Sequence, residues 1–433
     1  MRRMPQQHVI EADLTWTGKR FERGVRIAIG DDGRIAEVGR LAASPTKRLT
    51  NRALIPGMTN AHSHAFQRGL RGLGETFPPS QGRADFWTWR KAMYELVESL
   101  DEQALHKLCV QCFREMLAAG VTTVGEFHYL HHDSSEKGFA LDQVVLRAAK
   151  DAGVRIVLIE SYYRTGGIGQ PLQGGQLHFC TNSVDEYWQQ VDRIAGVVDR
   201  RTQSIAASAH SIRAASIDEI AELHQEATRR ALPFHMHVEE QPQEIEDCMQ
   251  HYGKRPLALL NERLDINPMF TAVHCTHCAE ADLDDYLDAG GNVCINPLTE
   301  GNLGDGIPNV PWMLRNRARI AIGSDSNLRL CWTEEMRWLE YIQRLRSGRR
   351  GIVIDEEGAC ARKLFECATI HGAQALGLRA GRIEAGCVAD FTALDLTKPS
   401  LEGWRDETLL DAFIFGTGNE AIADVCVGGR WLQ

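Results

Sequence analysis

From Leu54 to about position 378, short apolar runs alternate with longer stretches in which apolar residues recur at helical spacing. A short apolar run followed by an amphipathic helix is typical of a β/α unit, and consecutive units of this kind pair their strands in parallel. The unit recurs eight times, which predicts an α/β fold, a (β/α)8 barrel with functional residues at the carboxyl ends of its strands. The predicted strands are the run that ends before His62 and residues 121–127, 155–160, 204–209, 233–238, 270–274, 291–296 and 319–324.

The stretch before the second predicted strand shows the helical half of a unit. Apolar residues recur there at helical spacing from Leu105 to Leu117. Ser99 and Glu102 have the spacing of a capping box, which begins a helix, and Gly120 is a residue that typically ends one. We therefore predict a helix that is capped at Ser99 and stops at Gly120.

Both ends of the chain change to the two-residue period of β-strands. Residues 8–53 alternate apolar and polar side chains, and Asp31-Asp32-Gly33 between two of the runs is typical of a hairpin turn. The alternation returns after Leu378. We expect the two ends to pair as one small composite β-sandwich domain. The predicted limits are 1–54 and 379–433 for its two parts and 55–378 for the barrel.

Composition excludes several classes of protein. The formal net charge of −10 gives no basic surface of the kind that binds nucleic acid. No apolar run approaches the roughly 20 residues that span a bilayer, and residues 1–8 lack the apolar core of a signal peptide. The twelve cysteines are scattered through apolar runs, so we expect buried thiols in a cytoplasmic chain and no disulfide framework.

Histidines and a carboxylate fall at the ends of four predicted strands. His62 and His64 follow the first strand, and residues two apart on a strand point to the same face. His237 lies in the fifth strand, His274 ends the sixth, and Asp325 follows the eighth. Imidazole and carboxylate groups are the ligands of a catalytic zinc, which keeps one position open for water. The joint pattern favours a hydrolytic metal site.

Other histidines compete for these roles. His235 shares a face with His237, and we favour His237 because Glu240 follows it at a useful spacing. His277, with a cysteine on each side of it, invites a zinc-finger interpretation, but no second pair at finger spacing accompanies it. Three further histidines just past the second strand are expected to be solvated or hydrogen-bonded residues: His128, His131 and His132.

In its motifs the chain resembles the amidohydrolase superfamily over essentially its whole length. The shared features are Ile55-Pro-Gly-x-x-Asn-x-His-x-His64 and Gly381-x-Ile-x-x-Gly-x-x-Ala-Asp-Phe391. His237-x-x-Glu240 with His274 resembles the aminohydrolase branch, and within it the N-formimino-L-glutamate deiminases of histidine degradation. The motifs that carry this second resemblance are residues 62–72, 86–94, 126–133, 237–241, 299–306 and 323–326.

The resemblance implies hydrolytic deimination of N-formimino-L-glutamate to N-formyl-L-glutamate and ammonia. It implies one divalent metal, zinc by preference with iron or manganese as alternatives. The implied ligands are His62, His64, His237 and Asp325. Asp325 would also accept the proton of the attacking water, His274 would stabilise the tetrahedral centre, and Glu240 would protonate the leaving nitrogen. Since an unperturbed Glu titrates near pH 4.3, this last role requires that burial raise the pKa of Glu240.

A dicarboxylate substrate requires cationic partners in an otherwise acidic protein. By resemblance, the substrate contacts are Gln67, Arg90, Tyr129, His210 and Arg213. Arg213 follows the fourth strand at the barrel rim, whereas Arg90 could instead be a surface residue beside two tryptophans, and Tyr129 could simply pack. The resemblance also implies a homodimer.

The fourth strand carries no lysine. Binuclear members of the superfamily bridge their metals with a carboxylated lysine there, so the resemblance implies a mononuclear site unless Glu160 also reaches the metal. Segments 294–303 and 326–332 depart from the deiminase pattern near the pocket mouth. Three alternatives stay open: a deaminase of another amidine or a nucleobase-like heterocycle, a hydrolase of an amide or chloride, and a barrel without activity.

Overall fold

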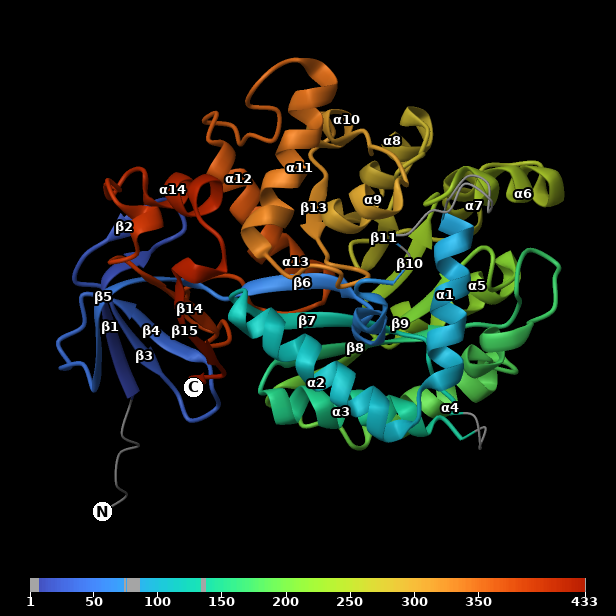
Figure 1. Cartoon of the computed structure of the whole chain (residues 1–433), viewed down its shortest axis with the longest axis horizontal. Coiled ribbons are helices and arrows are strands. Elements are labelled where there is room, and N and C mark those ends of the chain that lie inside the picture. The colour runs from blue at the N-terminus through green and yellow to red at the C-terminus, as the bar shows by residue number, and fades with distance from the viewer. Residues whose placement is uncertain (1–7, 74, 76–85, 134–137, 433) are drawn as a thin grey trace.

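The computed structural model describes residues 8–73, 75, 86–133 and 138–432 of the 433-residue chain. Two β-sheets organise it, a small one built from both chain ends and a larger one built from the middle (Figure 1). The signal-peptide prediction concerns a segment that lies almost wholly outside the described residues.

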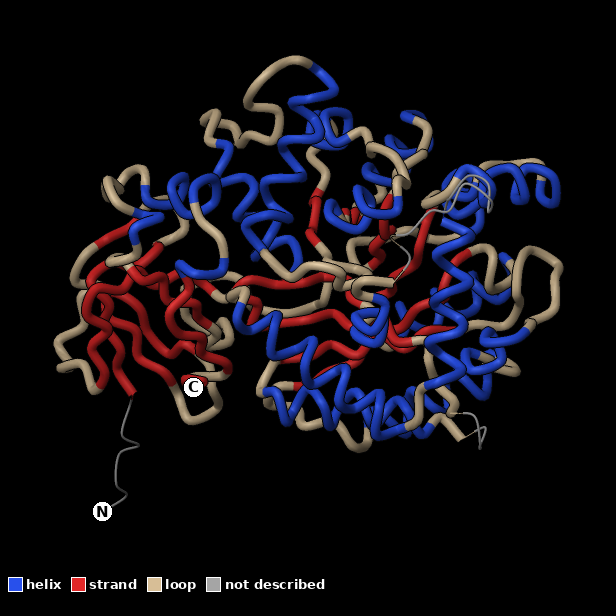
Figure 2. The backbone as a smooth tube through the Cα atoms, in the orientation of Figure 1, coloured by secondary structure: helices blue, strands red, loops and turns tan. Residues whose placement is uncertain are grey.

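The middle of the chain forms a barrel of eight parallel strands in chain order. The sheet closes beside its first strand, where the backbone N–H of Asp325 donates to the carbonyl of His62 (3.0 Å) and that of His64 donates to the carbonyl of Asp325 (2.9 Å). Helices surround the strands (Figure 2). The barrel strands are β6 (Met58–Ser63), β7 (Val121–His128), β8 (Arg155–Tyr162), β9 (Gln203–Ser211), β10 (Phe234–Val238), β11 (Phe270–His274), β12 (Asn292–Ile295) and β13 (Arg319–Ile322).

Most helices follow a barrel strand, as predicted. The helix that was predicted to be capped at Ser99 begins at a different residue. Asp101 caps α2 (Glu102–Ala118) by accepting from the backbone N–H of Ala104 (2.7 Å). Ser99 is still the last residue of α1 (Phe86–Ser99), and its hydroxyl donates to the carbonyl of Leu96 (2.6 Å). The predicted capping box at Ser99 is therefore wrong, because aspartate is an equally good N-cap two residues later. The helices are α1 (Phe86–Ser99), α2 (Glu102–Ala118), α3 (Ala140–Ala152), α4 (Val184–Ala195), α5 (Ile217–Arg229), α6 (Pro242–Tyr252), α7 (Pro256–Arg263), α8 (Glu280–Asp288), α9 (Pro297–Leu303), α10 (Val310–Arg315), α11 (Trp332–Ser347), α12 (Cys360–Glu366), α13 (Gly372–Ala375) and α14 (Leu409–Gly416).

The small sheet joins the two chain ends, with N-terminal strands in blue beside C-terminal strands in red (Figure 1). Its central pair is antiparallel, with Ile55 of β5 opposite Thr392 of β14. The predicted hairpin is confirmed, and its Gly33 has a φ of +75°, which glycine adopts without strain. The predicted fold class, a barrel with a composite β domain, is confirmed, and the domain limits stay a prediction. The strands are β1 (His8–Trp16), β2 (Phe21–Glu22), β3 (Arg26–Ile29), β4 (Ile35–Gly39), β5 (Lys47–Pro56), β14 (Phe391–Asp395), β15 (Ile422–Val427) and β16 (Arg430–Leu432).

A single residue, Gly57, separates β5 of the small sheet from β6 of the barrel. A Cβ atom at Gly57 would lie 2.1 Å from the hydroxyl oxygen of Thr122 on β7, so no side chain fits there. Because β6 leads directly into His62 and His64, this tight junction fixes where the first two candidate ligands enter the barrel.

Two composition-based predictions can be compared with the structure. None of the described helices combines the length and the apolarity needed to cross a bilayer. The twelve cysteines are free thiols, as predicted, and ten of them are buried.

Candidate metal-dependent active site

Three histidine side chains meet at the carboxyl end of the barrel. His62 and His64 stand two residues apart at the end of β6, and His237 comes from β10. The Nε2 atom of His62 lies 3.2 Å from Nε2 of His64 and 3.2 Å from Nε2 of His237. All three side chains are buried. The structure thus brings together the three histidines that were predicted as ligands.

Backbone carbonyls fix which ring nitrogens face this centre. The Nδ1–H of His64 donates to the carbonyl of Phe127 (2.8 Å), and that of His237 donates to the carbonyl of His210 (2.9 Å). A carbonyl oxygen only accepts, so the Nε2 atoms of these two neutral rings carry lone pairs that point inward. Burial keeps the rings neutral, since it lowers the pKa of His64 to about 3 and holds the pKa of His237 well below 6.5.

Hydrogen bonding alone does not satisfy this centre. A proton on Nε2 of His62 could serve only one of the two facing lone pairs, and Nδ1 of His62 has no hydrogen-bond partner among the described residues. A cation at the centre would instead be shared by all three nitrogens. The convergence of unprotonated nitrogens is the arrangement that a divalent metal ion requires.

Asp325 brings a carboxylate to the same centre. Its Oδ1 atom lies 3.3 Å from Nε2 of His64 and 3.8 Å from Nε2 of His62. Its φ of +50° is uncommon for a residue other than glycine and aims the side chain from just beyond β13. Burial raises the pKa of Asp325 to about 7, against the opposing effect of His274. We call His62, His64, His237 and Asp325 the mouth cluster; as a donor set, it fits a hydrolytic zinc.

His274, at the end of β11, lies between two carboxylates. Its Nε2 atom is 3.8 Å from Oε1 of Glu240 and 3.9 Å from Oδ2 of Asp325. Its Nδ1 atom is 3.4 Å from Oε1 of Glu300, a partner that sequence reasoning missed. Burial alone would lower the pKa of His274, but these carboxylates outweigh it and raise the pKa to about 10. A protonated His274 can stabilise charge that develops between Glu240 and Asp325.

Glu240 is paired with an arginine. Nη2 of Arg213 donates to Oε2 of Glu240 at 2.8 Å, and both side chains are buried. Burial acts to raise the pKa of Glu240, but Arg213 and then His274 outweigh it, so the pKa is lowered from 4.5. The expectation that burial raises this pKa is therefore wrong for the free protein, because it left out the charge of Arg213.

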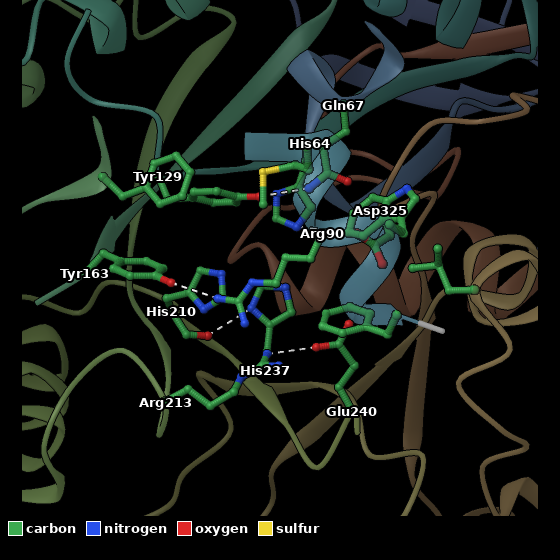
Figure 3. A pocket seen from close by; sticks show the side chains of 15 residues that line it. His64, Gln67, Arg90, Tyr129, Tyr163, His210, Arg213, His237, Glu240 and Asp325 are labelled. Carbon is green, nitrogen blue, oxygen red and sulfur yellow. Dashed lines mark hydrogen bonds and ion pairs between the residues drawn. The ribbon is translucent and has the colours of Figure 1, made fainter. Parts of the chain in front are cut away.

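One pocket opens onto the mouth cluster (Figure 3). Nε2 of Gln67 donates to the hydroxyl of Tyr129 (2.8 Å), and Nη2 of Arg90 donates to the hydroxyl of Tyr163 (3.0 Å). Two guanidinium groups thus share one space with Glu240 and with ligands of the mouth cluster. All five predicted substrate residues line this pocket: Gln67, Arg90, Tyr129, His210 and Arg213.

Sequence reasoning missed the aromatic part of the pocket wall, which includes Phe86, Tyr163 and Phe179. Tyr163 directly follows β8, and its place at a strand end is a signal that could have found it. Phe179 belongs to a long connection between β8 and α4 and carries no comparable signal. Of the segments that depart from the deiminase pattern, Leu303 is the one described residue that lines the pocket.

The competing histidines point elsewhere. Nε2 of His235 hydrogen-bonds the carbonyl of Ala375 (2.9 Å), and Nε2 of His277 hydrogen-bonds the carbonyl of Asp305 (2.8 Å). Among the described residues, neither belongs to a group that could share a metal ion. The geometry therefore agrees with the preference for His237.

A second group of buried histidines lies between the strands and helix α3. Nε2 of His128 and Nδ1 of His131 lie 3.0 and 2.9 Å from the same oxygen, Oδ1 of Asp142. Nε2 of His131 also hydrogen-bonds the carbonyl of Ser161 (2.8 Å). Oε2 of Glu160 lies 3.7 Å from Nδ1 of His131. We call His128, His131, Asp142 and Glu160 the outer cluster; Glu160 faces this cluster and not the metal centre.

A model of the amidohydrolase family matches residues 53–432. The chain belongs to the amidohydrolase family. It is also 36% identical over 418 residues to formimidoylglutamate deiminase from Pseudomonas aeruginosa, over 95% of this chain and 91% of that protein.

Solved structures agree with this family. An amidohydrolase from Brucella melitensis aligns with a TM-score of 0.85 at 32% identity, over 98% of this chain and 94% of that one. An adenosine deaminase from Xanthomonas campestris with bound zinc aligns with a TM-score of 0.81 at 24% identity, over 98% and 92% of the two chains. The second likeness shows the fold alone.

As an amidohydrolase the protein is a hydrolase of carbon–nitrogen bonds, which confirms the predicted class of enzyme. The family implies a divalent metal, and the converging nitrogens of the mouth cluster fit one. A barrel without activity is disfavoured, because the predicted ligands and the groups beside them are assembled at one place.

Proposed function

We propose that this amidohydrolase converts N-formimino-L-glutamate and water into N-formyl-L-glutamate and ammonia, as a step of histidine degradation. One observation carries the proposal: the guanidinium groups of Arg90 and Arg213 line the same pocket as the mouth cluster. An acidic protein that places two cations beside a hydrolytic centre is suited to a small dianion. The relative from Pseudomonas aeruginosa, which bears the name of this activity, supports it.

The residues that would hold the metal are His62, His64, His237 and Asp325. We propose a single zinc ion, because three neutral imidazoles and one carboxylate suit zinc and leave a position for water. Such an ion lowers the pKa of water toward 7, so that a nucleophile exists at neutral pH.

The protein's own groups would move the protons. Asp325, which lines the pocket beside the ligand histidines, is placed to accept a proton from the attacking water. His274, protonated at neutral pH, stabilises the charge of the tetrahedral centre. Glu240 faces the pocket and would carry protons to the nitrogen that leaves. Overall, water gives its oxygen to the formimino carbon and its two protons to the imino nitrogen of the neutral amidine, which departs as ammonia.

Ammonia release from N-formimino-L-glutamate by the purified protein tests this proposal, with metal content measured on the same sample. We expect turnover that is lost on chelation and restored by zinc at about one ion per chain. Adenosine and a simple uncharged amide serve as comparison substrates. No release from a fully metallated protein, or faster release from adenosine, would reject the dicarboxylate substrate and leave the metal site standing.

Removing one guanidinium tests the substrate contact. Arg213→Met should lower kcat/KM by roughly 10- to 150-fold, the effect of a charge-assisted hydrogen bond of about 1.5–3 kcal/mol. The matched control is Arg255→Met, because Arg255 pairs with Glu239 (2.6 Å), the neighbour of Glu240, and does not line the pocket. Equal losses in both variants, or none in Arg213→Met, would contradict the assignment.

A further inference from the structure

Arg213 holds three carboxylate-binding nitrogens in a buried place, and only two of them are used. Nη2 donates to Glu240 (2.8 Å), and Nε donates to the hydroxyl of Ser211 (3.3 Å) while lying 3.4 Å from Oε2 of Glu244. Nη1 is buried and has no hydrogen-bond partner among the described residues. Since Arg213 lines the pocket, an anion that enters can reach the guanidinium.

Glu244 is the second carboxylate beside this arginine, at ion-pair distance and without a hydrogen bond to it among the described residues. The Oε1 atom of Glu244 accepts the backbone N–H of Glu239 (2.9 Å), and the residue is 1% exposed. Glu240, in contrast, is 6% exposed and faces the pocket, with Arg213 as its hydrogen-bond partner on Oε2. If a third carboxylate competes for Arg213, the group free to leave is therefore Glu240.

The same pairing restrains Glu240 in the free protein. A carboxylate that donates protons must be able to take one up, and an ion pair with a buried guanidinium opposes this. Arg213 is the largest influence that lowers the pKa of Glu240, followed by His274 and, more weakly, Arg90. The other ionisable groups that act on Arg213 are Glu244 and Tyr163, and Arg213 in turn acts on His210.

We propose that Arg213 is shared in turn: it holds Glu240 in the free protein, and a substrate carboxylate that pairs with Arg213 releases Glu240 for proton transfer. The inference rests on the proposed deimination and adds a source of specificity to it. The carboxylate of the substrate would then raise kcat and not only affinity. An amidine without a carboxylate would bind while Glu240 is still paired with Arg213.

The exchange keeps the proton balance of the reaction. A third carboxylate beside Arg213 leaves excess negative charge, which the released Glu240 relieves by taking up a proton. That proton comes from the attacking water and passes to the amidine nitrogen, which departs as ammonia. Arg213 acts through Glu240 and so has a positioning role in this step.

Separating the carboxylate from the amidine tests the exchange. Formamidine keeps the reacting carbon and lacks both carboxylates, and propionate supplies a carboxylate as a second molecule. In the zinc-loaded protein, propionate should raise the kcat for formamidine roughly tenfold or more and saturably, because a freed general acid contributes on the order of 10²-fold or more. Sodium chloride at equal ionic strength is the control and should not stimulate.

Two variants test whether the stimulation by propionate depends on Arg213. Arg213→Met should abolish the stimulation by propionate, whereas Arg255→Met, which removes a neighbouring arginine outside the pocket, should retain it. No stimulation in the unmodified protein, or equal stimulation in Arg213→Met, would overturn the proposal. Turnover of N-formimino-L-glutamate is measured on the same preparation. If this substrate is turned over but propionate does not stimulate, the exchange is wrong and the proposed function stands; if the substrate is not turned over, the proposed function is wrong.

A crystal structure of the zinc-loaded protein with N-formyl-L-glutamate gives a readout that needs no variant. We expect Arg213 to contact a carboxylate of the ligand while Glu240 has moved out of hydrogen-bond distance from it. A ligand carboxylate on Arg213 with the Arg213–Glu240 pair intact would also overturn the proposal.

Discussion

The mouth cluster and the outer cluster contain the same kinds of side chain and are equally buried, yet they are built differently. In the mouth cluster, ring nitrogens face one another at 3.2 Å, and carbonyls hold the protons of His64 and His237 on the far side of each ring. In the outer cluster, the nitrogens of His128 and His131 face a carboxylate oxygen at 3.0 and 2.9 Å.

The difference lies in whether donors meet acceptors. Both ring nitrogens of His131 face acceptors, Asp142 and the carbonyl of Ser161, so this ring is held as an imidazolium. Burial would lower the pKa of His131, but Asp142 outweighs it and raises that pKa. The pairing of His128 and His131 with Asp142 satisfies those ring nitrogens without an ion, whereas the mouth cluster converges lone pairs without donors and needs one.

The largest expected effect comes from removing one imidazole of the mouth cluster. His237→Ala should lose bound metal and at least roughly 1000-fold in kcat, since the ion supplies several kcal/mol of transition-state stabilisation at about 1.4 kcal/mol per factor of ten. Metal analysis and ammonia release are the measurements. The matched variant His131→Ala removes an equally buried ring and should keep its metal; equal metal loss in both would erase the distinction between the clusters.

The next effect is on stability. Asp142→Asn keeps the shape of the side chain but leaves the charge of His131 without its partner, and breaking a buried pair in this way costs about 3–5 kcal/mol. We expect a lower urea midpoint with unchanged metal content in the folded protein. A variant as stable as the unmodified protein would mean that His131 is neutral and that the outer cluster is not an ion pair.

Sequence patterns were sufficient where a residue's role depends on its place along one element. The strand 270–274 was predicted to its limits, and His62, His64 and Asp325 stand at strand ends where a barrel collects them. The carboxyl ends of parallel strands lie at the same end of the barrel. The hydrophobic period of the sequence and the place of a residue along its strand therefore predict together which side chains meet.

Partners that come from another element were beyond such patterns. Asp142 lies on the buried face of an amphipathic helix, and nothing near it in sequence marks it as the acceptor for His128 and His131. The pairing of Arg213 with Glu240 joins two strand ends, and it reversed the expected direction of a pKa shift. The direction of such a pKa shift depends on charged residues that tertiary packing brings close, and the local sequence does not show which residues these are.

A smaller effect is the pH dependence of the difference in stability between the Asp142→Asn variant and the unmodified protein. The folded pKa of Asp142 is lowered from 3.8, so its contribution is present above that value and is lost as pH falls through the folded pKa. The folded pKa of His131 is raised from 6.5, so its contribution is full below 6.5 and is lost as pH rises through the folded pKa.

The gap in urea midpoint between the two proteins should therefore be widest between about pH 4 and pH 6.5 and should narrow at alkaline pH. Urea unfolding at about pH 5 and about pH 9 measures it. A gap that stays constant with pH would show that the two groups do not form a charged pair.

The smallest expected effect is at Glu160, the one carboxylate that could have made the metal site binuclear. Both of its oxygens are buried without a hydrogen-bond partner among the described residues, and burial followed by the charge of Asp142 raises its pKa well above 4.5. A carboxyl group whose ionisation is opposed by burial and by a neighbouring negative charge loses little when it becomes an amide. Glu160→Gln should therefore change the free energy of unfolding by less than about 1 kcal/mol, with one metal ion per chain and kcat unchanged. Titration calorimetry of the metal-free variant with zinc is the measurement, with the unmodified protein as control. A drop from two bound ions to one on substitution would place Glu160 in a metal site and make the outer cluster a second metal centre.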